Sequence, residues 1–175
     1  KIFLEIFNPE RTALFSRLAS FRDVGYLAGG TALALQLGQR VSVDFDVFTY
    51  KPVNNQLRAK ISELLSIQHI HLNTSDQYTF TTDTNIEMTF VWFDYPLINP
   101  LVTTRSLSLS SIADIAANKA NTLGRRALWR DYVDLFWLIK EGGVTIEHII
   151  SWSKQKHPTE FVKEQFLEQL IYFKD

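Results

Sequence analysis

Two aspartates separated by one residue are the first side chains that could carry chemistry together. Asp44 and Asp46 lie in the stretch 41–48, where apolar and polar residues alternate as in a strand. Side chains two apart in a strand share a face, so the two carboxylates and Ser42 are expected to converge. A divalent cation held by oxygen ligands, Mg²⁺ or in its place Mn²⁺, would relieve their repulsion. By itself, the pair is more often a solvated strand face near the edge of a sheet than a metal site.

A second feature with chemical potential is the turn formed by Gly29, Gly30 and Thr31. It lies between a short apolar strand, 26–28, and a helix over 31–37. Such a turn exposes backbone N–H groups at the positive end of a helix dipole, where phosphate binds well, and Thr31 adds a hydroxyl. No Gly-Lys-Ser/Thr follows, so this is not a P-loop. The alternative is an ordinary strand-to-helix turn.

The two features together are more specific than either alone, because one element would hold phosphates and the next the metal that bridges them. The segment LAGGTALALQLGQRVSVDFDVF resembles the core motif of AbiEii/AbiGii-type nucleotidyltransferases. These are toxin components of abortive-infection and toxin–antitoxin systems within the DNA polymerase β-like superfamily. The resemblance implies that Asp44 and Asp46 bind the metal, while Gly29, Gly30, Thr31 and Ser42 bind the nucleotide.

The resemblance continues in IADIAANKANTLGRRALWRDYVDLFWLI and covers roughly residues 20–141. It implies nucleotide-binding roles for Lys119, Arg126 and Arg130. It also implies a catalytic role for Asp131, either as a base or in holding Lys119 and Arg126. The alternatives are a surface lysine and an i,i+4 salt bridge between Arg130 and Asp134, worth only about 0.3–0.5 kcal/mol.

One position departs from the family pattern. The strand in TNIEMTFVWFDYP carries Thr89 where related sequences typically have a third carboxylate, which binds the catalytic metal and helps deprotonate the attacking hydroxyl. Glu87 shares a face with Thr89 and is the candidate substitute, with Asp94 a weaker one. A Glu87 side chain directed at the aspartates would favour an enzyme, and one facing solvent would favour a catalytically impaired nucleotide- or RNA-binding protein.

The elements that must position these residues form an α/β (α+β) pattern. Strands are expected at 26–28, 41–48, 67–72, 78–82 and 86–93. Helices are expected after the Asn8-Pro9 cap and at 31–37, 54–65, 111–123, 128–141, 145–156 and 159–173. The sequence thus predicts a small mixed-sheet nucleotidyltransferase core with flanking helices over 1–108 and a helical C-terminal subdomain over 109–175.

Composition narrows the class of protein without naming it. The 175 residues carry a formal net charge of −1, so no global basic field indicates nucleic-acid binding. The chain has no cysteine, which excludes thiolate metal sites and fits a cytoplasmic protein. No apolar run approaches membrane-spanning length, so no membrane partner is expected. His148 and His157 are expected at the surface.

These observations and the resemblance predict nucleotidyl transfer from an NTP, with Mg²⁺, to a hydroxyl of RNA (for example tRNA) or of a protein. The expected setting is a toxin–antitoxin pair with a separately encoded antitoxin. The alternative is the impaired binding protein on the same fold. A third reading is a structural domain whose Asp-x-Asp is only a solvated face.

Overall fold

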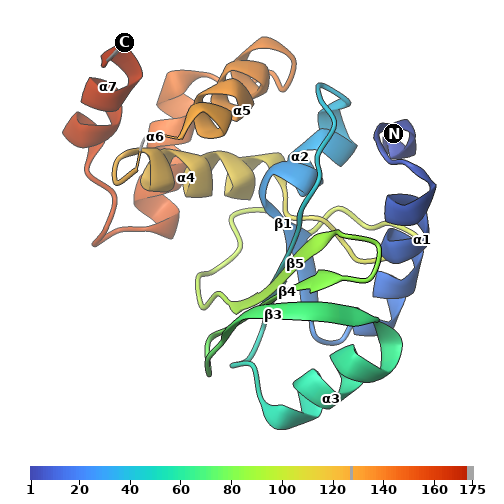
Figure 1. Cartoon of the computed structure of the whole chain (residues 1–175). Coiled ribbons are helices and arrows are strands. Elements are labelled where there is room, and N and C mark those ends of the chain that lie inside the picture. The colour runs from blue at the N-terminus through green and yellow to red at the C-terminus, as the bar shows by residue number, and fades with distance from the viewer. Residues whose placement is uncertain (127, 173–175) are drawn as a thin grey trace. The chain divides into compact units, whose positions relative to one another are not determined.

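A computed structural model describes residues 1–126 and 128–172, and the chain divides into two compact units. The first comprises residues 1–94 and 101–110, and the second comprises 95–100 and 111–175. The chain therefore enters the second unit at Tyr95, returns to the first at Leu101 and leaves it again after Ser110. The mixed α+β architecture expected from the sequence is confirmed (Figure 1).

The first unit is built on a five-stranded mixed sheet in the order β1-β2-β5-β4-β3. Only β2 and β5 run parallel, and the other neighbours are antiparallel. β2 and β5 are neighbours in the sheet although two other strands lie between them in the sequence. The strands are β1 Gly25–Ala28, β2 Phe45–Thr49, β3 Ile67–Asn73, β4 Gln77–Thr82 and β5 Glu87–Trp92.

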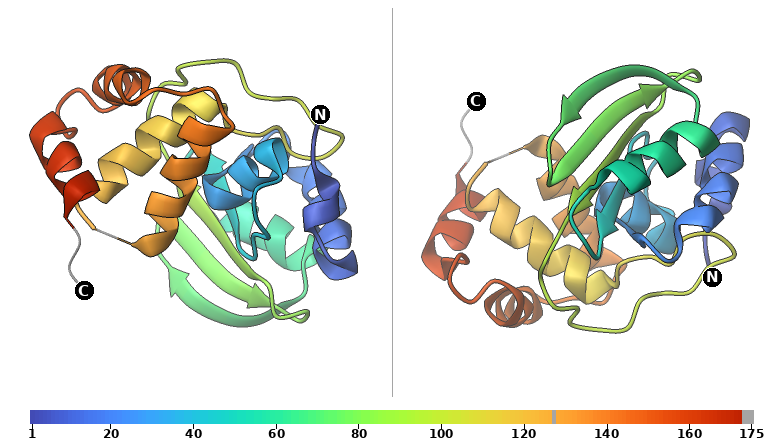
Figure 2. Two further views of the ribbon diagram at one scale, coloured as in Figure 1. Left: turned by 90° about the horizontal axis from the view of Figure 1, so that it is seen from above. Right: turned by 90° about the horizontal axis from the view of Figure 1, so that it is seen from below.

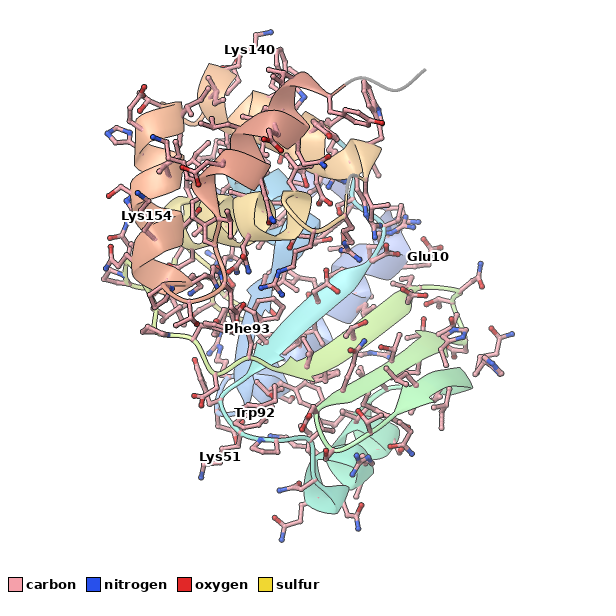
Figure 3. The ribbon with its side chains drawn as sticks, turned by 90° about the vertical axis from the view of Figure 1, so that its left-hand side faces the viewer. Glu10, Lys51, Trp92, Phe93, Lys140 and Lys154 are labelled. Carbon is pink, nitrogen blue, oxygen red and sulfur yellow. The ribbon has the colours of Figure 1, made fainter. Side chains whose placement is uncertain are left out.

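Helices flank the sheet, and their starts follow local capping chemistry. The Asn8 and Asn54 side chains accept hydrogen bonds from backbone N–H groups three residues on, and Pro9 fits the first turn of its helix. Figure 3 looks onto one face of the sheet, with α1 behind the strands. The α-helices of this unit are α1 Pro9–Arg17, α2 Gly29–Leu37 and α3 Asn55–Leu64.

Strand alternation assigns the two faces of the sheet. In β2 and β5 the residues Phe45, Val47, Met88 and Phe90 are fully buried, whereas the residues between them are half-buried or exposed. Phe90 packs against Phe21, whose ring centroid lies 5.2 Å away. Burial of these apolar side chains fixes the register, since a one-residue slip would turn them all outward.

The strand expected at 41–48 begins later than predicted, at Phe45. Val41 and Val43 are exposed, so the apolar side of the alternation does not reach the core there. Thr31 donates to the carbonyl oxygen of Asp44 and holds this backbone in place of a strand partner. The alternation alone could not reveal this tertiary hydrogen bond.

The described part of the second unit contains four helices, and α5 and α6 each lie against α4 (Figure 2). Ser111 caps α4 by accepting from the Asp114 backbone N–H. Of the two expected C-terminal helices, the first is present with nearly the predicted bounds, and the second begins later than predicted, at Lys163; its predicted end at residue 173 lies outside the described residues. The helices are α4 Ile112–Leu123, α5 Trp129–Lys140, α6 Ile146–Lys156 and α7 Lys163–Ile171.

A fully buried ion pair organises the second unit. Lys156 Nζ lies 2.7 Å from Asp114 Oδ1 and 2.7 Å from the Pro96 carbonyl oxygen. Asp114 also accepts from the backbone N–H groups of Ile98 and Asn99. The segment 95–100 is thereby held to α4 and α6.

The expectation that His157 lies at the surface is wrong, because this side chain is buried. Its Nε2 lies 2.9 Å from Asn118 Oδ1. Burial, followed by the positive charge of Lys156, lowers the pKa of His157 to about 4. His148 is exposed, as expected, and closes a capping box with Thr145 at the start of α6.

Candidate functional site

The turn from β1 into α2 brings a carboxylate against the start of a helix. Gly29 has φ of +64°, and a Cβ built on it would lie 2.5 Å from Asp46 Oδ2. Glycine is therefore required twice, once by the backbone conformation and once by the close approach of the aspartate. Asp46 pairs with Ala28 across the strands, which sets this approach. Phosphate-binding N–H groups and a metal-binding carboxylate would then lie side by side.

Thr31 and Ser42 fix the backbone that leads to the aspartates. The Thr31 hydroxyl lies 2.8 Å from Ser42 Oγ and also hydrogen-bonds to the Asp44 carbonyl oxygen. Thr31 and Ser42 are buried, with 2% and 6% of their surface exposed. In this structure they act as supports of the Asp44 backbone. Asp44 precedes β2, so the strand rule that predicted its convergence with Asp46 does not apply to it.

Thr89 lies directly opposite Asp46 on the neighbouring parallel strand. Its hydroxyl is 3.2 Å from that of Thr79 on β4. Glu87 begins β5, shares the Thr89 side of the strand and is exposed. A neutral hydroxyl thus occupies the sheet position next to Asp46, and the nearest carboxylate along β5 faces solvent.

The two aspartates carry oxygen ligands of the kind that a magnesium ion prefers, and a bound nucleotide would supply the remaining ligands. Asp44 and Asp46 are half-buried and supply hard oxygen ligands. Within residues 1–126 and 128–172, no group of three or more His, Cys, Asp or Glu side chains could hold a metal. Proteins typically bind Mg²⁺ through one or two carboxylates together with the phosphates of a substrate. Two aspartates are therefore enough to bind Mg²⁺ with a nucleotide, but too few to bind it with protein ligands alone.

In the second unit, Lys119 is held between two buried aspartates of α5. Its Nζ lies 2.7 Å from Asp131 Oδ1 and 2.9 Å from Asp134 Oδ2. The exposed fractions of these side chains are 13% for Lys119, 2% for Asp131 and 0% for Asp134. Lys119 thus neutralises half of this acidic pair and links α4 to α5.

One oxygen of this cluster has no partner. Asp131 Oδ2 is buried and accepts no hydrogen bond from any group in the described part of the chain. Buried acceptors left in this way are rare and often mark functional positions. The side chains of Arg126 and Arg130, just before Asp131 in the sequence, are exposed.

The structure therefore arranges the predicted residues in two sets. The first unit holds the Gly29 turn, Thr31, Ser42, the two aspartates and Glu87. The second holds Lys119, Asp131 and the two arginines. Sequence reasoning paired Asp134 with Arg130 as one alternative and missed its bond to Lys119. The i,i+3 spacing of Asp131 and Asp134 was the available signal, because it places both on one face of α5.

Comparison with known proteins decides the family. The sequence profile of the family described as nucleotidyl transferase AbiEii toxin, type IV TA system, matches residues 12–169. The chain belongs to this family. The resemblance seen in the motifs is thereby confirmed.

Proteins similar to this AbiEii family member include a protein of related sequence and two solved structures of similar fold. An uncharacterized protein of Aquifex aeolicus (strain VF5), aq_aa25, is 30% identical over 156 residues, which are 86% of this chain and 74% of that protein. A proposed nucleotidyltransferase of H. pylori superposes with a TM-score of 0.61 at 18% identity, over 94% of this chain and 93% of its own. JHP933 of Helicobacter pylori gives 0.60 at 19% identity, over 98% and 91%. The nucleotidyltransferase fold is confirmed.

None of the helices in the described residues is both long and apolar enough to span a membrane.

Proposed function

We propose that this AbiEii family member transfers a nucleotidyl group from an NTP to a hydroxyl acceptor. The acceptor oxygen forms a bond to the α-phosphorus, the bond between the α-phosphorus and the bridging oxygen breaks, and pyrophosphate leaves. The hydroxyl proton passes to a base. The acceptor is an RNA 3′ end, for example of a tRNA, or a protein hydroxyl.

One observation carries this proposal: Asp46 lies against Gly29 at the start of α2. A carboxylate in this place would repel phosphate unless a cation lay between them, and the positive end of a helix dipole attracts phosphate. The combination therefore suits a metal-bound nucleotide better than a free anion or a free metal. Gly30 continues the helix start, and Thr31 and Ser42 keep Asp44 in place.

Asp44 and Asp46 would hold the magnesium ion. When bound, Mg²⁺ offsets the charge of the triphosphate and of the leaving pyrophosphate. Lys119, Arg126 and Arg130 are proposed as further phosphate contacts. Lys119 is already held by two carboxylates, whereas the side chains of Arg126 and Arg130 are exposed at the surface. Asp131 then serves chiefly to hold Lys119.

Two carboxylates are candidates for the base that accepts the proton of the attacking hydroxyl. Glu87 would have to reach from its exposed position at the start of β5, and Asp131 would use its unpartnered Oδ2. A carboxylate can take the proton of a hydroxyl only within hydrogen-bond reach of it. We assign the role to Glu87, since Asp131 is committed to the buried cluster with Lys119.

A second function is favoured by a specific observation. Thr89 stands opposite Asp46, and Glu87 faces solvent, so the strand that supplies a third carboxylate in related proteins supplies none at this position. A protein of this kind would bind metal and nucleotide without turning them over. Its partner as a toxin-family member would be a separately encoded antitoxin under either function.

Isothermal titration calorimetry with each of the four NTPs, with and without Mg²⁺, tests the site. We expect one NTP or more to bind only with magnesium, and Asp46→Asn to abolish the binding. Asp76→Asn, an exposed aspartate in the turn before β4, is the matched control and should bind as the wild type does. Binding that ignores magnesium or persists in Asp46→Asn would contradict the proposed site.

A further inference from the structure

One face of α5 is exposed and aromatic. Trp129 is 77% exposed and Phe136 is 56% exposed. Residues 7 and 11 positions apart in a helix return to nearly the same side, so Trp129, Phe136 and Lys140 form one line about 16 Å long. We call these three residues the α5 strip. Large aromatic side chains left this exposed usually mark a binding surface.

Most of the exposed charges on and beside the α5 strip are positive; the exceptions are the exposed Glu141, which follows Lys140, and Glu160, which pairs with Arg125. Among the described residues of the segment 125–140, every exposed charged side chain is basic, although the whole chain carries a net charge of −1. The only carboxylates in the segment, Asp131 and Asp134, are buried on the opposite side of α5 with Lys119. The exposed basic residues are Arg125, Arg126, Arg130 and Lys140.

Cations and rings are also in contact on this surface. Lys140 Nζ lies 5.7 Å from the Phe136 ring centroid and 4.8 Å from that of Trp137. Phe136 and Trp137 meet edge to face, with centroids 5.6 Å apart. Figure 3 shows the Lys140 side chain extending away from the ribbon. The strip therefore ends in an aromatic pair with an ammonium group at its rim.

We propose that the α5 strip binds single-stranded RNA. Bases stack on exposed aromatic rings, and flanking cations follow the phosphates of the same strand, which is how strands are held without reading their sequence. Trp129 and Phe136 are about 10 Å apart along the helix axis, which leaves space for separate bases. This inference rests on the proposed function in one respect, since the strand would be the acceptor.

The charge pattern favours RNA over a protein partner. An apolar protein interface depletes charge at its centre, whereas here four exposed basic residues, Arg125, Arg126, Arg130 and Lys140, accompany the two rings and outnumber the one exposed carboxylate beside them, Glu141. A duplex fits less well than a single strand, because its bases are already stacked and cannot reach the rings.

Binding of a 5′-fluorescein-labelled single-stranded RNA dodecamer, followed by anisotropy with the full chain, tests the proposal. The buffer contains EDTA and no NTP, so that neither metal nor chemistry contributes. Trp129→Ala and Phe136→Ala should each weaken binding by about fivefold to a hundredfold, the loss expected for one stacked base. Lys140→Gln should reduce the slope of log affinity against log salt by about 0.7.

Tyr50→Ala is the matched control, because Tyr50 is 50% exposed and lies in the first unit. It should bind RNA as the wild type does. Equal affinity of wild type and the Trp129→Ala/Phe136→Ala variant would overturn the proposal. So would light scattering that shows a wild-type dimer dissociated by the same double substitution while RNA affinity stays unchanged, since the strip would then be an interface between copies.

The two proposals fail separately. Asp46→Asn should keep its RNA affinity, since the assay contains no metal or nucleotide. RNA binding that depends on the α5 strip, without nucleotidyl transfer by the wild type, would refute the proposed activity and support the strip. Transfer to a protein hydroxyl by a chain that binds no RNA would support the proposed activity and refute RNA binding by the α5 strip.

Discussion

Thr89 lies opposite Asp46 on the neighbouring parallel strand, where the family resemblance leads us to expect a carboxylate. A threonine hydroxyl is a weak ligand for a divalent cation and no base at neutral pH. Under the proposed function, this position therefore distinguishes a protein that only binds a nucleotide from one that also has three carboxylates at its metal site.

Thr89→Asp should make stability depend on magnesium. Without metal, a new carboxylate beside Asp46 adds like-charge repulsion and should lower the free energy of unfolding by about 1 kcal/mol. With Mg²⁺ and NTP the loss should be recovered, and magnesium affinity should rise. Thermal melts with and without Mg²⁺ measure both effects. Thr89→Asn, which has the same shape without the charge, is the control, and an equal magnesium response in the two variants would contradict the expectation.

His157 should make the folded state sensitive to mild acid. Its pKa is about 4 in the folded chain, against 6.5 when it is unperturbed. The unfolded chain therefore binds a proton between these values that the folded chain does not, so stability should fall as pH decreases from about 6.5 to 4. The shift corresponds to about 3 kcal/mol.

Denaturant unfolding at several pH values measures this slope for the wild type and for His157→Gln. The glutamine variant should show a flatter dependence between pH 4 and 6.5. His69→Gln, which changes an exposed histidine, should keep the wild-type slope. A His157→Gln profile parallel to the wild type would show that another group controls the transition.

Residue positions were predictable where a local pattern carried them. The Gly29-Gly30 turn between a strand and a helix follows from the sequence, whereas the roles of the two aspartates and of Thr89 stay predictions. The burial of Lys156 with Asp114 was not predictable, because the partners are 42 residues apart in the chain and neither position has a pattern that predicts a buried charge. His157 was misplaced for the same reason.

At the scale of elements, the turn from β1 to α2 positions the candidate site. It combines a left-handed glycine with a carboxylate from the neighbouring strand. Neither the helix nor the strand alone would create this contact, so the register between β1 and β2 is what places Asp46 at the helix start.

Gly29→Ala should damage both stability and nucleotide binding. The positive φ costs about 1–2 kcal/mol for a residue with a Cβ, and the new methyl group would also displace the Asp46 carboxylate. Gly143→Ala is the matched control, since Gly143 has φ of +67° and nothing within 4 Å of a built Cβ. Gly143→Ala should lower the free energy of unfolding only by the cost of the positive φ and should leave nucleotide affinity unchanged. Equal losses of stability and unchanged nucleotide affinity in both variants would contradict the close approach of Asp46.

Lys119→Met should destabilise the junction of α4 and α5. It removes the Lys119 ammonium group from the buried carboxylates of Asp131 and Asp134, and breaking a buried ion pair in this way typically costs about 3–5 kcal/mol. Urea unfolding gives the value. Lys60→Met, which removes an exposed ion pair with Asp23, should cost less than about 1 kcal/mol. If Lys119→Met/Asp131→Asn/Asp134→Asn is no more stable than Lys119→Met, the buried charges are not the cause.

Helix positions were predictable because their caps are local, as at Asn8, Asn54 and Ser111. The start of β2 was not, because the Thr31 hydroxyl binds the Asp44 carbonyl from another element. Periodicity reports which side chains alternate and not whether the backbone finds a strand partner.

At the scale of the whole molecule, the chain crosses between its two units three times. The segment 95–100 belongs to the second unit through Lys156 and Asp114, although residues on both sides of it belong to the first. The nucleotidyltransferase fold persists in Helicobacter pylori proteins at 18–19% identity. The persistence of this fold at such low identity fits a fold determined by the pattern of core residues.

The measurement that tests the central claim most directly is transfer of label from α-³²P-NTPs, each supplied alone with Mg²⁺. A cell extract that contains both RNA and protein provides the acceptors, which are separated by nuclease and protease digestion afterwards. The claim predicts label in one of these fractions with the wild type and none with Asp44→Asn/Asp46→Asn. Absence of label from both fractions, in a wild-type chain that binds the same NTP with magnesium by calorimetry, would contradict catalysis and establish the binding protein instead.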